Sequence, residues 1–390
     1  MYREPFHVVT KAVGAACNMS CSYCFYSEKM SFYNNCRLMD DGTLELFVRD
    51  YINSNPGNVI NFLWQGGEPL IAGIGFYKKA LEFEKKYCGA KTITNSIQTN
   101  GTLITEEWCR FFRENNFLVG ISLDGPADIH NAYRCMKDGG KSHEQVERGI
   151  DLLQKYGVDF NVTSCVTDVA AAEPLKVYEY FKSLGIKYIQ FAPIVERMPD
   201  NDETMLIHAS PDSDSRKYAP GTVDALAYGK FLSEIFDKWA KHDMGEVFVM
   251  NFEWAIAAWM DLPTGYCVFS DKCGNCLAIE HNGDVFSCDH YVYSDYYLGN
   301  LKEKTFSDML GSKCQADFRN KKKDIPQNCK YCDYFFMCHG ECPKNRILPG
   351  GENYFCEGYK YYFEHIRPYL AKIERALRSK NFGGHVCKEV

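Results

Sequence analysis

No run of apolar residues in this 390-residue sequence reaches the roughly 20 that a membrane-spanning helix needs. The first residues lack the long hydrophobic core and cleavage site of a secretory signal peptide. Basic residues form no concentrated block of the kind that binds nucleic acid, and the net charge is −7. The short run Lys321-Lys322-Lys323 is predicted to be a solvated loop. We therefore expect a cytoplasmic protein with neither a membrane nor a nucleic acid as its partner.

Cysteine, in contrast, is abundant, with 19 residues in the chain. Disulfides do not persist in the cytoplasm, so this many thiols indicate metal or redox chemistry. Their distribution is uneven, because more than half lie between Cys267 and Cys356. This asymmetry predicts two regions with different roles.

Three cysteines near the start of the chain, Cys17, Cys21 and Cys24, have the spacing C-x3-C-x2-C. Three thiolates can hold three irons of a four-iron cluster and leave the fourth iron open, whereas electron-transfer clusters usually have four cysteine ligands. A zinc site would need a fourth ligand, and the nearest candidate, Cys36, has no suitable spacing. The motif therefore favours a cluster that binds and reduces another molecule.

Strand-like and helix-like segments alternate over the first 200 residues, which is typical of βαβ units with a parallel sheet. The predicted strands are 6–13, 59–64, 91–98, 117–123, 159–166 and 187–191. The predicted helices between them are 40–53, 76–87, 106–115, 145–156 and 173–184. Six such strands predict an α/β fold, a partial or full barrel, whose site lies at the carboxyl ends of the strands.

The second half begins with a polar loop over 198–221, and a helix with one apolar face follows it. Asn282-Gly283 between two short strands, 277–281 and 284–288, predicts a hairpin with a type I′ turn. A closing helix is predicted over 359–378. The resulting division is a barrel over 5–225, a helical and strand linker over 226–266, a cysteine-rich domain over 267–370 and a flexible tail over 379–390.

The turn Gly66-Gly67-Glu68-Pro69 follows the second predicted strand. Glycines without a Cβ allow the backbone to approach a ligand closely. Glu68 places a carboxylate near the predicted cluster, where it is a plausible clamp for an ammonium group. Taken alone, this motif would be only a turn that contains an acid.

The cluster motif with Phe25 and Tyr26 after it, together with the Gly-Gly-Glu-Pro turn, resembles the radical S-adenosylmethionine enzymes. In that family the amino and carboxylate groups of S-adenosylmethionine chelate the open iron. An electron from the reduced cluster then yields methionine and a 5′-deoxyadenosyl radical, which abstracts hydrogen from the substrate.

The cysteine-rich end resembles the SPASM domain, which holds auxiliary four-iron clusters. The cysteines that carry this resemblance are Cys267, Cys273, Cys288, Cys329, Cys332, Cys338, Cys342 and Cys356. A zinc ribbon would explain single pairs of them but not the series. Cys276 is an alternative to Cys273 for one ligand position.

Among SPASM proteins, the sequence is most similar to the anaerobic sulfatase-maturating enzymes. The motifs that carry this similarity are those above with Gln98-Thr99-Asn100-Gly101, Ser122-Leu123-Asp124-Gly125-Pro126, Gln190-Phe191 and Cys288-Asp289. The resemblance implies oxidation of a Cys or Ser in an unfolded or nascent sulfatase polypeptide to formylglycine (3-oxoalanine). It also implies a monomer and an electron donor such as a flavodoxin or ferredoxin.

The resemblance also implies site residues for S-adenosylmethionine and three [4Fe-4S] clusters. The radical-generating cluster is expected on Cys17, Cys21 and Cys24. Contacts to S-adenosylmethionine are expected from Tyr26, Gly67, Glu68, Ser122, Arg134 and Val195. The first auxiliary cluster is expected on Cys267, Cys273, Cys288 and Cys342, and the second on Cys329, Cys332, Cys338 and Cys356. Asp289 matches the residue that accepts the proton of the substrate's OH or SH group.

Two alternatives stay open from the sequence. One is another SPASM peptide maturase, such as a thioether cross-linker, although such enzymes often carry a leader-binding domain and only sixteen residues precede Cys17 here. The other is a non-enzymatic iron–sulfur or zinc protein, which metal analysis would distinguish.

Overall fold

One mixed sheet organises the chain in a computed structural model that describes residues 4–31, 38–200 and 209–378. The strand order is β10-β9-β8-β1-β2-β3-β4-β5-β6-β7. The predicted tail, 379–390, and part of the predicted loop over 198–221 lie outside the described residues. None of the helices formed by the described residues is both long and apolar enough to cross a membrane.

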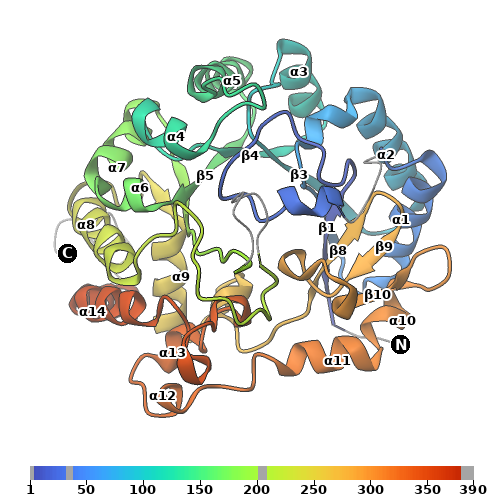
Figure 1. The fold of residues 1–390 in the computed structure, drawn as a ribbon. Helices are drawn as coiled ribbons and strands as arrows, with labels where there is room; N and C mark the ends of the chain where they lie inside the picture. The colour runs from blue at the N-terminus through green and yellow to red at the C-terminus, as the bar shows by residue number, and fades with distance from the viewer. Residues whose placement is uncertain (1–3, 32–37, 201–208, 379–390) are drawn as a thin grey trace.

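Seven strands run parallel in sequence order and form the partial barrel seen in Figure 1. They are β1 (His7–Lys11), β2 (Val59–Trp64), β3 (Thr92–Thr99), β4 (Leu118–Ser122), β5 (Phe160–Val166), β6 (Tyr188–Pro193) and β7 (Phe248–Val249). The six predicted strands match β1 to β6 to within a few residues, and the prediction of an α/β partial barrel is confirmed. In the part of the chain that the structure describes, β7 and β10 end the sheet without pairing with each other, so the barrel is open.

Helices cover the outside of the barrel strands (Figure 1). They are α1 (Asp41–Ser54), α2 (Ile74–Tyr87), α3 (Glu106–Glu114), α4 (Ala127–Tyr133), α5 (His143–Tyr156), α6 (Asp168–Ala171), α7 (Pro174–Ser183), α8 (Ala225–His242) and α9 (Met250–Trp259). Several begin at side-chain caps that satisfy free backbone N–H groups. Asp40 accepts from the backbone N of Thr43, and Asp224 accepts from that of Ala227. The short helices α4 and α6 were not predicted, because four to seven residues carry little periodicity.

The core lies between these helices and the strands and is rich in aromatic rings. Trp64 of β2 is fully buried and packs edge-on against Phe47 of α1 and Tyr77 of α2. Its indole N–H donates to Asn95 of β3 at 2.8 Å. A polar contact of this kind allows a large aromatic residue to be buried without an unpaired donor.

The cysteine-rich region extends the barrel sheet. Its strand β8 (Cys276–Glu280) pairs in parallel with β1, so that residues about 270 positions apart are neighbours. Antiparallel strands β9 (Asp284–Phe286) and β10 (Tyr297–Asn300) continue the sheet. The predicted hairpin is present, but its type I′ turn is wrong. Asn282 does not adopt the positive φ that such a turn requires, and the one positive φ is that of Gly283, at +93°.

The rest of the region consists of short helices and one long one. They are α10 (Phe306–Leu310), α11 (Lys313–Asn320), α12 (Gln327–Lys330), α13 (Phe335–Cys338) and α14 (Cys356–Arg378). The 3-10 helices within the described residues are Ser27–Ser31, Pro69–Ala72, Cys267–Phe269, Asp289–Tyr291, Ser294–Tyr296, Pro343–Asn345 and Pro349–Gly351. The predicted closing helix corresponds to α14, which lies against α8 (Figure 1).

Helices α8 and α14 meet at two glycines. A Cβ on Gly358 would lie 1.9 Å from the backbone oxygen of Ala225, and one on Gly229 would lie 2.3 Å from the backbone oxygen of Gly358. Real Cβ atoms do not come so close to backbone, so the crossing depends on glycine on both helices. This contact fixes the end of the cysteine-rich region against the barrel.

Candidate active site

The loop after β1, called the cluster loop below, carries Cys17, Cys21 and Cys24. The thiol of Cys17 accepts from the backbone N of Met19 at 3.4 Å and from the side-chain amide of Asn100 at 3.8 Å. Burial raises the pKa of Cys21, and the negative charges of Cys24 and Cys17 add to the rise. The three thiols are therefore neighbours at the carboxyl end of the strands, as the spacing predicts.

The Gly66-Gly67 turn at the end of β2 lies directly against this loop. A Cβ on Gly67 would lie 2.0 Å from the backbone oxygen of Ala16, and its φ is +44°. A Cβ on Gly66 would lie 2.3 Å from Cδ of Lys11. The backbone N of Glu68 donates to Ala16 at 2.7 Å. Only glycine allows the turn and the cluster loop to approach this closely.

The carboxylate of Glu68 is fully buried and joins the ends of β2 and β3. It accepts from the backbone N of Leu70 at 2.9 Å, from the hydroxyl of Thr99 at 2.7 Å and from the backbone N of Asn100 at 2.8 Å. Burial raises the pKa of Glu68 to about 7 in spite of these donors. The carboxylate therefore holds the turn in place, and the backbone of the turn is the part that faces the cluster loop.

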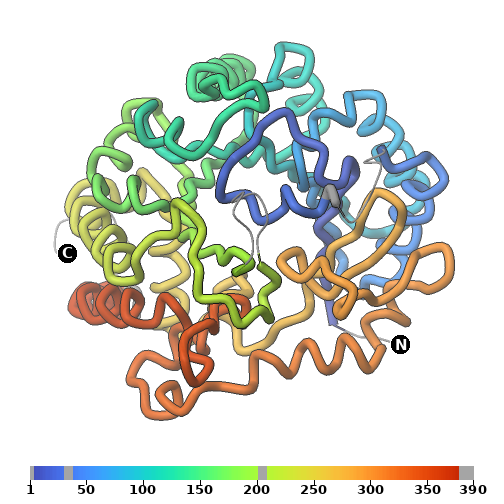
Figure 2. The backbone as a smooth tube through the Cα atoms, in the orientation of Figure 1, coloured from blue at the N-terminus to red at the C-terminus, as the bar shows by residue number. Residues whose placement is uncertain are grey.

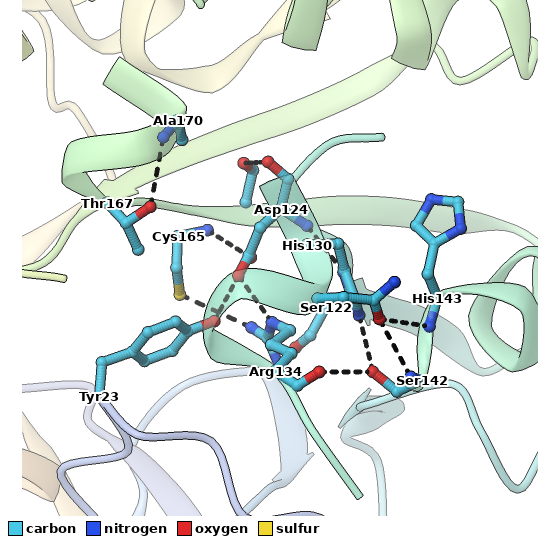
Figure 3. Close-up of polar contacts among 12 residues, drawn as sticks. Tyr23, Ser122, Asp124, His130, Arg134, Ser142, His143, Cys165, Thr167 and Ala170 are labelled. Carbon is cyan, nitrogen blue, oxygen red and sulfur yellow. Dashed lines mark hydrogen bonds and ion pairs between the residues drawn. The ribbon is translucent and has the colours of Figure 1, made fainter. Parts of the chain in front are cut away.

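Arg134, after α4, lies in a buried ion pair rather than a surface one (Figure 3). Its Nε donates to Asp124 at 2.9 Å, and its Nη2 donates to the thiol of Cys165 at 3.6 Å. Asp124 also accepts from the hydroxyl of Tyr23 and, at 2.9 Å, from the backbone N of Cys165. The guanidinium is close enough to Cys21 for its positive charge to oppose the rise in that thiol's pKa.

A second chain of hydrogen bonds supports the backbone on both sides of this pair (Figure 3). His130 Nδ1 accepts from the backbone N of Asp124 at 3.3 Å, so its Nε2 carries the proton and donates to Ser142 at 3.0 Å. The Ser142 hydroxyl donates to the backbone oxygen of Arg134 at 3.0 Å. Burial lowers the pKa of His130 to about 3, which keeps the ring neutral.

The other residues expected to contact S-adenosylmethionine lie on three different segments. Ser122, at the end of β4, accepts from the side-chain amide of Gln98 at 3.0 Å. Tyr26 is buried, and its hydroxyl donates to the buried carboxylate of Glu280. Val195 is buried just after β6. The structure thus places all of them around the carboxyl end of the barrel.

Asp289 begins the 3-10 helix that follows β9. Its carboxylate pairs with the ammonium of Lys11 at 2.5 Å, and Lys11 is 1% exposed. Burial would raise the pKa of Asp289, but the positive charges of Lys11, His290 and Lys344 outweigh it and leave the pKa lowered. Lys11 is the last residue of β1, so this ion pair joins the cysteine-rich region to the strand that precedes the cluster loop.

The eight C-terminal cysteines that are expected to be cluster ligands fall into two groups. Cys288 is close enough to Cys267, Cys273 and Cys342 for their charges to raise its pKa, after burial as the larger cause. Cys276 is also close enough to Cys288 for its charge to raise the pKa of that thiol. The other four line one pocket together with aromatic side chains, and they are Cys329, Cys332, Cys338 and Cys356. Two sets of four thiols suit two further four-iron clusters, and the three thiols of the loop after β1 suit a cluster with one iron open to a cofactor.

A separate pocket lies between the segment after Cys24, the segment after β6 and the cysteine-rich region. Figure 2 shows the first two segments crossing the centre of the view. Glu196 and Lys344 form a 2.5 Å ion pair in its wall. The lining residues are Phe25, Val195, Glu196, Arg197, Ala209, Pro211, His290, Tyr293, Lys344 and Ile347. Val195 and His290, the residue after Asp289, thus share one pocket.

Lys11 and Asp124 are two residues whose roles sequence reasoning missed. The signal for Lys11 was a charged residue within a mostly apolar predicted strand, shortly before the cysteine motif. The signal for Asp124 was its place in Ser122-Leu123-Asp124-Gly125-Pro126. Neither signal identifies the residue with which Lys11 or Asp124 forms an ion pair, and only the folded structure shows it.

Two family models match the chain. The radical SAM superfamily model matches residues 12–181, and a model described as an iron–sulfur cluster-binding domain, SPASM, matches residues 269–333. The fold, the cysteine groups and the two family models together define a radical S-adenosylmethionine protein with a second iron–sulfur region.

Curated relatives and solved structures narrow this class. A serine-type anaerobic sulfatase-maturating enzyme of Bacteroides thetaiotaomicron is 42% identical over 99% of this chain and 95% of its own length. A cysteine-type enzyme of Clostridium perfringens is 31% identical over 96% of this chain and 100% of its own. The solved structure "Native anSMEcpe with bound AdoMet and Cp18Cys peptide" matches with a TM-score of 0.84 and 32% identity, over 96% of this chain and 99% of that one. The chain belongs to the anaerobic sulfatase-maturating enzyme family.

Proposed function

We propose that this chain oxidises a Cys or Ser residue of a sulfatase polypeptide to formylglycine. The observation that carries the proposal is the Lys11–Asp289 ion pair. It places a carboxylate beside Cys288 and at the end of the strand that leads to Cys17, Cys21 and Cys24. This position supports Asp289 as the acceptor of the substrate's proton.

The cofactors are S-adenosylmethionine and three [4Fe-4S] clusters, on the three cysteine groups. When bound, they supply the hydrogen-abstracting radical and the route by which electrons leave. The backbone at Gly67 and Glu68 binds the methionyl amino group, Ser122 and Arg134 bind its carboxylate, and Tyr26 and Val195 line the adenosyl pocket. The close contact of Gly67 with Ala16 and the burial of Arg134 support this assignment.

The substrate is an unfolded or nascent polypeptide, since the target side chain has to reach buried groups. The pocket lined by Phe25, His290 and Tyr293 is the proposed entrance, and His290 is the residue after Asp289. Asp289 takes the proton from the target's SH or OH group, and Lys11 holds the carboxylate in position. The enzyme works as a monomer in the cytoplasm, with a flavodoxin or ferredoxin as electron donor.

The test is anaerobic incubation of reconstituted protein, S-adenosylmethionine and reductant with Cys- and Ser-containing sulfatase peptides. Aldehyde-bearing peptide and 5′-deoxyadenosine are expected. Asp289→Asn should lower the rate of aldehyde formation by about 100-fold or more, as is usual when a general base is lost, while 5′-deoxyadenosine still forms. Asp295→Asn, at an exposed position of the next 3-10 helix, is the matched control. Absence of both products from the wild-type protein would refute the proposal.

A further inference from the structure

The predicted solvated loop at Lys321-Lys322-Lys323 is wrong for its middle residue. Lys322 is 2% exposed, whereas Lys323 is exposed. The ammonium of Lys322 donates to the backbone oxygens of Cys267 and Val268, at 2.6 and 2.8 Å. A buried lysine is costly unless it is hydrogen-bonded and its charge is compensated, so this position calls for an explanation.

The charges around Lys322 belong mainly to the first auxiliary cysteine group. Burial lowers the pKa of Lys322, and the negative charges of Cys273, Cys342, Cys267 and Glu341 oppose that change. Glu341 is itself held by the side-chain amides of Asn345 and Asn353. None of the largest charges that act on Lys322 belongs to a cysteine of the second auxiliary group.

Arg346 fixes the loop that carries Lys322. Its guanidinium donates to the backbone oxygens of Lys321, Lys322 and Asp324, at 3.1, 3.1 and 2.6 Å, and to that of Gly340 at 3.1 Å. Arg346 therefore holds three carbonyls of this loop and joins them to the segment at Gly340, so the ammonium of Lys322 is fixed relative to the cysteines.

We propose that Lys322 raises the reduction potential of the first auxiliary cluster, and this inference rests on the proposed assignment of that cluster. A reduced cluster carries one more negative charge than the oxidised one. A fixed positive charge in a water-poor site stabilises the reduced state, because charge and solvent exposure set the potentials of such clusters. Lys322 thus makes this cluster a better acceptor of the electron that leaves the substrate.

The experiment is a redox titration of the reconstituted full-length enzyme, followed by electron paramagnetic resonance. In Lys322→Met, one midpoint potential should shift to more negative values, while the other two stay unchanged. Lys322→Arg, which keeps the charge, should leave all three near the wild-type values. Lys323→Met removes the same charge from an exposed neighbour and should also change nothing.

Iron and sulfide analysis accompanies each variant. If Lys322→Met loses iron, Lys322→Gln provides the comparison, because its amide still donates a hydrogen bond without the charge. Unchanged potentials in a fully loaded uncharged variant would overturn the inference and leave the proposed function standing. A wild-type protein that holds no auxiliary cluster would overturn both.

Discussion

Two buried carboxylates of the barrel have opposite surroundings. Asp124 has a guanidinium, a phenol and a backbone N–H around it. Among the residues that the structure describes, Glu84 in α2 has no cationic partner and accepts only from the side-chain amide of Asn95 at 2.8 Å, and its second oxygen is buried without a partner. The carboxylate of Asp124 therefore positions the guanidinium of Arg134, whereas that of Glu84 destabilises the folded protein when it is ionised.

Asp124→Asn should weaken binding of S-adenosylmethionine. The substitution removes the charge that holds Arg134, and a hydrogen bond to a charged group contributes about 1.5–3 kcal/mol, or roughly 10- to 100-fold in affinity. The dissociation constant for S-adenosylmethionine should rise while the KM for peptide stays near its wild-type value. Asp128→Asn breaks the exposed pair with Lys176 and is the control. Equal affinities in the two variants would contradict this positioning role.

Glu84→Gln should remove a pH dependence of stability. Burial raises the pKa of Glu84 to about 8, from 4.5 in the unfolded chain. Between these values the unfolded state releases a proton that the folded state keeps, so stability falls as pH rises through this window, by up to about 1.4 kcal/mol per pH unit. The melting temperature of Glu84→Gln relative to wild type should therefore increase from pH 5 to pH 8.

The exposed Glu82 of the same helix provides the control for that series. Glu82→Gln should keep a constant difference from wild type at every pH. A Glu84→Gln difference that is equally flat would show that Glu84 ionises normally in the folded protein.

At the scale of elements, the pairing of β8 with β1 places Asp289 beside Lys11. The sequence predicts both strands from their apolar residues, and it predicts the hairpin from Asn282-Gly283. It does not predict that the two strands are neighbours, because strand periodicity carries no information about a partner about 270 residues away. The turn prediction was wrong for a related reason. Asn-Gly suits more than one turn, and the strand ends select between them.

The crossing of α8 and α14 is a second contact between the barrel and the cysteine-rich region. Sequence periodicity could not predict this contact either. Gly358→Ala should lower the melting temperature, since its methyl group would lie 1.9 Å from a backbone oxygen of Ala225. Overpacking of this kind costs about 1–3 kcal/mol. Gly75→Ala in α2, with nothing within 4 Å of the added carbon, should instead stabilise by roughly 0.5–1 kcal/mol, because alanine favours helix. Equal melting temperatures for the two variants would refute this packing account.

At the scale of the whole molecule, the site is assembled from segments of both halves of the chain. The spacing of Cys17, Cys21 and Cys24 was sufficient to predict the first group of thiols, because ligand chemistry restricts residue type and spacing together. The division of the other eight cysteines into two groups was implied by the resemblance to the family. Lys11, Asp124 and Lys322 were missed because a lysine or an aspartate is usually solvated, and only the fold shows that these three are buried. Glu68 was predicted to clamp an ammonium group. Its hydrogen bonds to Thr99 and Asn100, which join the ends of β2 and β3, could not be predicted from the sequence of the turn.

The measurement that tests the central claim most directly uses a sulfatase peptide with deuterium at Cβ of the target Cys or Ser. The protein is incubated anaerobically with S-adenosylmethionine and reductant, and both products are analysed by mass spectrometry. We expect deuterium in 5′-deoxyadenosine together with formylglycine in the peptide. Unlabelled 5′-deoxyadenosine and an unchanged peptide would contradict it.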